Sequence, residues 1–132
     1  MAILIIVVIA IGYFSREYFR KPTDVLSLKT STTIDATALI QEFRNDEEIA
    51  NAKYLGKTIE VRGRILEVFN EADTMLNIFL GDSSRLNKVS CLMDVRYFKK
   101  YGRLMPGSLQ IIKGVCTGFL MDVELNRCII IK

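Results

Sequence analysis

The side chains best suited to binding chemistry are an aromatic ring, an amide and several cations in the second half of the chain. Asn77 and Phe79 alternate along a strand-like segment that has cations on both sides. A ring that stacks on a base, with cations near the phosphates, is what a single-stranded nucleic acid requires. Phe79 could instead pack under a neighbouring helix. The candidate ligand-binding face therefore consists of Arg64, Asn77, Phe79, Arg85, Lys88 and Phe119.

A second group of cations has helical spacing. Arg96, Lys99, Lys100 and Arg103 are three or four positions apart, so on a helix they share one face. Such a candidate basic helix face would meet anionic lipid headgroups, with each cation contributing about 1 kcal/mol near the surface. The plainer interpretation is a solvated helix face.

The three cysteines are spread over three predicted strands. In an oxidising compartment a Cys116–Cys128 disulfide is possible, and otherwise Cys91, Cys116 and Cys128 serve as small core residues. The chain has no histidine, which is the commonest metal ligand and general base, and its cysteines form no CxxC pair. We therefore expect no metal site and no cofactor. The absence of paired carboxylates, a nucleophile motif and a phosphate loop predicts that the protein is not an enzyme.

The composition suits one folded domain with an appendage. The chain has 132 residues, half of them hydrophobic and a quarter charged. Its net charge of +3 slightly favours anionic partners. The apolar content is high enough for the body of the chain to fold rather than to stay disordered.

The amino terminus is a continuous apolar segment. Ala2–Phe14 contains no charge, and a helix of this length would be about 20 Å long against a hydrocarbon core of about 30 Å. Aromatic and basic residues follow it, including Tyr18, Phe19 and Arg20, as at a membrane interface. We expect residues 1–21 to form an uncleaved, single-pass transmembrane helix in a bacterial inner membrane. A signal-peptide core and a buried helix are the alternatives, and the side of the membrane that the domain occupies stays open.

Residues 22–34 are polar and predict a linker. Residues 35–56 have the apolar spacing of one or two helices, with Asp35 as the first N-cap. An Asn45-Asp46 break divides them, and Asn45 with Glu48 is similar to a capping box at the start of the second helix.

Residues 57–132 carry the pattern of a small barrel. Five strands are predicted over 57–69, 74–80, 88–94, 108–120 and 123–131, with a short helix at 95–101. Gly63, Gly114 and Gly118 lie where long strands would have to bend in order to close a barrel. The fold class is therefore mainly β with α: a five-stranded OB-fold Greek-key barrel preceded by helices, with residues 35–132 as one domain.

Several short motifs resemble a known family. They are Tyr54-Leu55-Gly56-Lys57, Val89-Ser90-Cys91, and the stretch from Lys113 to Phe119 followed by Asp122-Val123 and Cys128. Together they look like the tRNA_anti-like family of small bacterial OB-fold domains, which are often membrane-anchored. The resemblance covers about residues 39–132. It implies the fold and the architecture, and it lends weak support to nucleic-acid binding.

Two functions from different classes follow. The first is a membrane-tethered OB-fold module that binds single-stranded nucleic acid or another extended ligand. The second is a structural or protein-interaction module of the bacterial envelope, with a protein partner and no nucleic acid. Salt-dependent binding of single strands supports the first and its absence counts against it.

Overall fold

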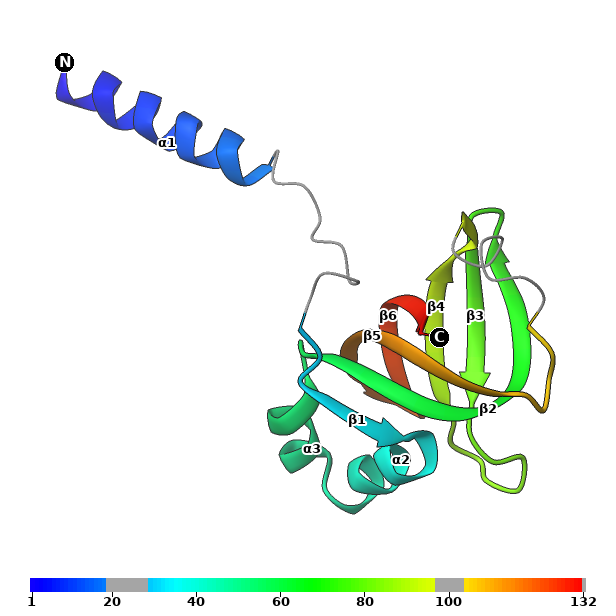
Figure 1. Cartoon of the computed structure of the whole chain (residues 1–132). Helices are drawn as coiled ribbons and strands as arrows, with labels where there is room; N and C mark the ends of the chain where they lie inside the picture. The colour runs from blue at the N-terminus through cyan, green and yellow to red at the C-terminus, as the bar shows by residue number, and fades with distance from the viewer. Residues whose placement is uncertain (19–28, 97–103, 132) are drawn as a thin grey trace.

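The chain is mainly β, with helices at its amino-terminal side. The computed structural model describes residues 1–18, 29–96 and 104–131, and Figure 1 shows them in ribbon form. In chain order the elements are α1 (Ala2–Tyr18), β1 (Thr32–Asp35), α2 (Ala36–Asn45), α3 (Glu47–Tyr54), β2 (Thr58–Ala72), β3 (Met75–Leu80), β4 (Val89–Asp94), β5 (Leu109–Leu120) and β6 (Asp122–Ile131).

α1 is a helix of 17 residues that is apolar over Ala2–Phe14, and the side chains of residues 2–16 are exposed. Ile3, Ile6 and Ile9 are each about two thirds exposed or more, at 78%, 65% and 65%. Within the part of the chain that the structure describes, no helix is both long and apolar enough to cross a membrane.

Five strands close into a barrel. The sheet order is β1-β2-β3-β4-β6-β5, and an additional β2–β5 pairing joins its ends. All pairings within the barrel are antiparallel except β4–β6, which is parallel. The predicted five-stranded barrel is confirmed, and each predicted strand from the second to the fifth begins within one residue of the observed one.

β2 serves two partners, as its central glycine predicted. Residues 58–64 pair with β5, and residues from Ile65 onward pair with β3. The change of partner falls between Arg64 and Ile65, one residue beyond Gly63. A Cβ atom at Gly63 would lie 2.9 Å from the Cβ of Ala36 and 3.2 Å from the Cβ of Leu80. The missing side chain therefore lets α2 and the end of β3 approach the bend.

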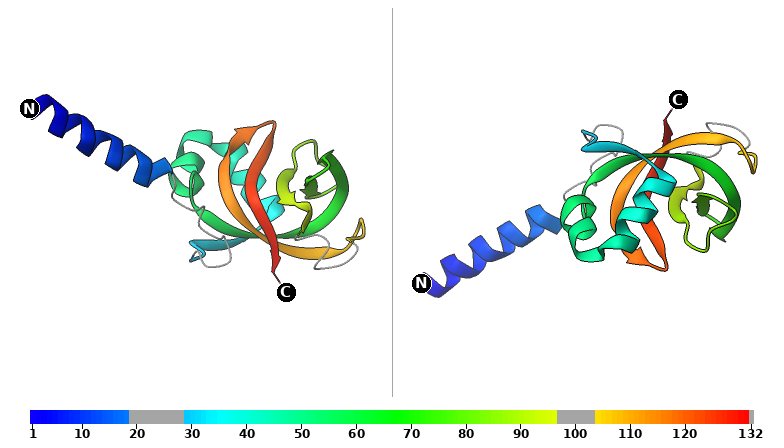
Figure 2. Two further views of the ribbon diagram at one scale, coloured as in Figure 1. Left: turned by 90° about the horizontal axis from the view of Figure 1, so that it is seen from above. Right: turned by 90° about the horizontal axis from the view of Figure 1, so that it is seen from below.

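α2 and α3 pack against the barrel (Figures 1 and 2). Leu39, Ile40 and Phe43 of α2 are fully buried in the same core cluster as the inward residues of the strands. The predicted break between the helices is confirmed, but the N-cap of α3 is Asp46 rather than Asn45. The Asp46 side chain accepts a hydrogen bond from the backbone N–H of Ile49 at 3.1 Å. An aspartate is as good a cap as an asparagine, so the sequence did not separate the two.

The end of the predicted linker is a strand. β1 pairs in parallel with β2, with Thr32 opposite Ile59 and Asp35 opposite Arg62. It has only four residues, and this is too short for apolar alternation to be recognised in the sequence. Asp35 then occupies the N-cap position of α2 as predicted, although its side chain makes no capping hydrogen bond.

Candidate ligand-binding face

The outer faces of β3 and β4 form one continuous surface. In β3 the inward residues are buried, whereas Met75, Asn77 and Phe79 point outward and are half-buried. Across the antiparallel pair, Phe79 lies opposite Ser90 and Asn77 lies opposite Leu92. Side chains on one face of neighbouring strands are in contact, so these residues share a surface.

Phe69 of β2 extends this surface and was missed by the sequence analysis. The β2–β3 register shifts between Ile65 and Glu67, and this shift places Phe69 directly opposite Asn77. The rings of Phe69 and Phe79 meet edge to face, with centroids 5.8 Å apart. Phe69 is 51% exposed, so half of an aromatic ring is open to a ligand. A bulge adds one residue to the alternation, and simple counting along the strand does not reveal it.

The charges on this surface are largely paired. The Lys88 ammonium lies 5.5 Å from the centroid of the Phe79 ring and 3.7 Å from a Glu67 carboxylate oxygen. Arg96 forms an ion pair with Asp94 at 2.8 Å, and the hydrogen bonds from Arg96 hold the pKa of Asp94 below its usual value. The surface therefore offers aromatic and polar contacts more than net positive charge.

A groove of about 370 Å³ crosses β3, β4 and β6 beside the aromatic pair. Within it the Ser90 hydroxyl donates a hydrogen bond of 2.8 Å to the side-chain oxygen of Asn77. Glu124 lies opposite Ser90 in the β4–β6 register. No cation is found among the described residues that line the groove, which are Met75, Asn77, Ser90, Leu92, Glu124, Leu125 and Asn126.

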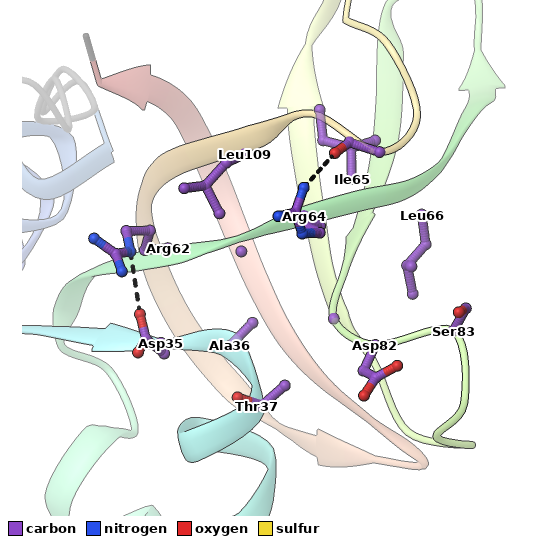
Figure 3. A pocket seen from close by; sticks show the side chains of 13 residues that line it. Asp35, Ala36, Thr37, Arg62, Arg64, Ile65, Leu66, Asp82, Ser83 and Leu109 are labelled. Carbon is purple, nitrogen blue, oxygen red and sulfur yellow. Dashed lines mark hydrogen bonds and ion pairs between the residues drawn. The ribbon is translucent and has the colours of Figure 1, made fainter.

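Arg64 lies in a different cavity, of about 670 Å³, between β2, the start of α2 and the residues after β3 (Figure 3). Its guanidinium donates to the backbone carbonyl of Gly107 at 2.9 Å. Arg62 lines the same cavity and pairs with Asp35 at 3.3 Å. Asp82 also lines it, and a hydrogen bond from the backbone of Ser84 lowers the Asp82 pKa. Two arginines and two aspartates thus balance each other in this cavity.

Two other predicted face residues lie elsewhere. Arg85 donates a hydrogen bond of 3.4 Å to the side chain of Gln41 on α2. Phe119 stacks on Phe43 with ring centroids 5.6 Å apart and packs against the hydrophobic core. Of the six residues predicted for the face, the structure brings together Asn77, Phe79 and Lys88. Arg64 and Phe119 point elsewhere because β2 and β5 curve around the barrel, and Arg85 lies in the loop between β3 and β4.

The candidate basic helix face falls mostly outside the described residues. Arg96 is described and its side chain pairs with Asp94, at the end of β4. Lys99, Lys100 and Arg103 lie in the range 97–103, outside the described residues.

All three cysteines are free and buried. Cys116 and Cys128, the pair considered for a disulfide, are both reduced in the structure. Cys128 lies instead beside Cys91, whose thiol interacts with its own.

The fold has relatives among solved structures. One is a crystal structure described as a "putative nucleic acid-binding lipoprotein" from Klebsiella pneumoniae subsp. pneumoniae, with 20% identity and a TM-score of 0.62 over 85% of this chain and 100% of that one. Another is a putative aspartyl-tRNA synthetase from Leishmania major, with 14% identity and a TM-score of 0.51 over 90% of this chain and 25% of that one. At these identities the likeness shows the fold alone.

A comparison with curated proteins gave no significant match. The sequence pattern of the tRNA_anti-like family, in contrast, matches residues 1–130, which is nearly the whole chain. The match extends over the helices and all the strands of the barrel. The chain therefore belongs to the tRNA_anti-like family, as its motifs had indicated.

Proposed function

We propose that this protein is a membrane-associated binding module that holds a short single-stranded nucleic acid on the outer face of β2, β3 and β4. The observation that carries the proposal is the Phe69–Phe79 edge-to-face pair, which lies next to a polar groove. Exposed rings on this face of an OB-fold provide a stacking surface for bases. The role is binding, and it assigns no catalytic step to any residue.

Stacking sets the expected affinity. Each base stacked on an aromatic side chain contributes about 1–3 kcal/mol, so two bases contribute about 2–6 kcal/mol. The Lys88 ammonium lies 5.5 Å from the centroid of the Phe79 ring, and Glu67 offsets its charge. Phosphate contacts therefore add little, and the dissociation constant should be about tens of micromolar or weaker. A plot of the logarithm of the association constant against the logarithm of the salt concentration should have a slope shallower than about −0.7, the value for one phosphate contact with a single strand.

The groove suggests which base is preferred. It is lined by one carboxylate, from Glu124, and by amide and hydroxyl groups, and such a lining disfavours a phosphate. A carboxylate accepts a hydrogen bond from the N4 amino group of cytosine, whereas thymine presents an oxygen at the equivalent position. The groove is therefore suited to an unstacked cytosine, and oligo(dC) should bind more tightly than oligo(dT).

Membrane association is the second part of the proposal, and α1 supports it. Its apolar side chains are exposed on every side, and burying them in a lipid bilayer would gain about 25 cal/mol per Å² of apolar surface. The solved relative whose description contains "lipoprotein" points in the same direction. A vesicle-flotation assay tests this part. The full chain should float with vesicles, an Ile6→Lys, Ile9→Lys variant should not, and Ile49→Lys on α3 should behave as the unsubstituted chain.

Binding is tested by titrating the full chain, in detergent micelles, into labelled nine-nucleotide strands of dC and of dT at several salt concentrations. The unsubstituted chain should bind dC better, and Glu124→Gln should reduce the preference without abolishing binding. A matching DNA duplex serves as the control and should bind less well, because its bases are already stacked. Failure to bind either single strand at high micromolar protein would contradict the proposal.

A protein-interaction module is the second candidate, and the charge pairing on the face favours it. The Lys88–Glu67 and Arg96–Asp94 pairs leave a surface without excess positive charge. A photo-reactive amino acid at position 69 should then give one reproducible protein adduct in native membranes. The same substitution at position 109, in the larger cavity, is the control. If no single strand binds and position 69 captures the same protein repeatedly, this second function replaces the first.

A further inference from the structure

Cys91 of β4 and Cys128 of β6 form a pair of adjacent thiols inside the barrel. β4 and β6 are hydrogen-bonded neighbours, with Cys91 opposite Leu125 and Cys128 opposite Met93. A register shift lies between these two pairs, so the two cysteines are diagonal neighbours across it. Cys91 is fully buried and Cys128 is 1% exposed, and both belong to the core cluster. Their side chains therefore point to the same interior rather than to opposite faces of the sheet.

The space around the Cys128 sulfur is provided by a glycine. A Cβ atom at Gly114 of β5 would lie 2.7 Å from the Cys128 sulfur, so any larger residue at 114 would displace it. The thiols of Cys91 and Cys128 interact directly, and burial together with this interaction raises the pKa of Cys128. Diagonal neighbours on adjacent strands have Cα atoms about 7–8 Å apart, whereas a disulfide spans roughly 4.4–6.8 Å, so the cross-link requires a small shift of β6 toward β4 at the irregular register.

We propose that Cys91 and Cys128 are a cross-linking site, at which a disulfide locks β6 onto β4. The oxidant is an external disulfide, either a small molecule or a thiol–disulfide oxidoreductase. One thiol loses its proton and its sulfur attacks the external disulfide, which releases one external thiolate and leaves a mixed disulfide. The second sulfur, as a thiolate, then attacks the mixed disulfide and releases the other external thiolate. Both cysteine sulfurs are oxidised, the external disulfide is reduced to two thiols, and these take up the two protons.

The position in the fold determines when the reaction occurs. Both thiols are inaccessible in the folded barrel and the pKa of Cys128 is raised, so few thiolates are available for attack. The reaction therefore takes place before the last strand has closed the barrel, or during its transient opening. Among the strands that the structure describes, β6 comes last in the sequence, and it lies between β4 and β5 in the sheet. Once formed, the bond retains β6 in the sheet and disfavours reopening of the barrel.

The test uses the full chain, unfolded in urea with a reductant and then refolded with oxidised glutathione as the probe. Free thiols are counted afterwards under denaturing conditions, and the linkage is mapped by peptide mass spectrometry. We expect the count to fall from three to one, a peptide joining Cys91 to Cys128, and a higher urea midpoint for the oxidised protein. Retention of three free thiols, or a linkage that contains Cys116, overturns the proposal.

The third cysteine provides a matched control. Cys116 is also fully buried, but its thiol interacts with the backbone of Gly118, whereas the Cys128 thiol interacts with Cys91. Cys116→Ala should still form the cross-link, so that its thiol count falls from two to zero. Cys128→Ala and Cys91→Ala should each retain two free thiols and show no shift of the midpoint upon oxidation. If either of these two variants fails to fold, the thiol count and the peptide map of the unsubstituted chain still decide the question.

Discussion

The most informative perturbation of the proposed binding face is Phe69→Ala. Phe69 is 51% exposed, and its described ring contact is the edge-to-face pair with Phe79. Replacing a fully buried phenylalanine by alanine lowers the free energy of unfolding by about 3–5 kcal/mol. Because Phe69 is half-buried, we expect a loss of about 2 kcal/mol. Loss of one stacked base would weaken binding by about 1–3 kcal/mol, which is about 5- to 150-fold. The binding loss is therefore measurable even though the domain stays folded.

The assay is fluorescence anisotropy of a labelled oligo(dC) strand with the full chain, paired with a urea unfolding curve for each variant. Leu109→Ala is the matched control, because Leu109 is 54% exposed but lines the larger cavity on β5. It should bind as the unsubstituted chain does. Binding of the Phe69→Ala variant within twofold of the unsubstituted chain, with the domain folded, would refute the assignment of the face.

Three further predictions follow from specific contacts. Glu67→Gln removes the carboxylate that lies 3.7 Å from the Lys88 ammonium, so the oligonucleotide should bind more tightly and with a steeper salt dependence, measured by the same titration. Gly114→Ala places a Cβ 2.7 Å from the Cys128 sulfur, and overpacking of this kind should lower the free energy of unfolding by about 1–3 kcal/mol in urea. Despite the partial burial of Glu42, which opposes ionisation, hydrogen bonds from Tyr54 and Lys53 lower its pKa below 4.5. Because the folded-state pKa is the lower one, this stabilisation is complete above about pH 5 and is lost as the pH falls below about 4.5. Glu42→Gln should therefore lose less stability than the unsubstituted chain in this acid range, as followed by thermal unfolding.

The barrel was predictable because its signals are local. Alternation along Met75–Leu80 and Val89–Asp94 gives the inward and outward faces directly, and the structure reproduces both patterns. Gly63 marks the bend of β2 because no other residue permits the close approach of Ala36 there. The break between α2 and α3 was equally visible, since polar residues interrupt the apolar spacing.

The face was predicted only in part, because curvature and register are not local. Phe69 was missed because the register shift after Ile65 changes which residues point outward. Phe119 was misplaced because its burial depends on Phe43 of α2, 76 positions earlier in the chain. Arg64 follows the same outward alternation as its neighbours, but the bend of β2 directs it to the larger cavity instead. A sequence pattern gives the side of a strand, whereas the surface that this side faces depends on how the barrel closes.

The proposal that nucleic acid binds on the outer face is tested most directly by amide chemical shifts of the ¹⁵N-labelled full chain in micelles, titrated with a nine-nucleotide dC strand. The account predicts saturable shifts at Phe69, Asn77, Phe79, Ser90 and Glu124, with the amides around the larger cavity unchanged. Chemical-shift changes confined to the larger cavity, or no changes at a millimolar concentration of the dC strand, would contradict the assignment of the outer face.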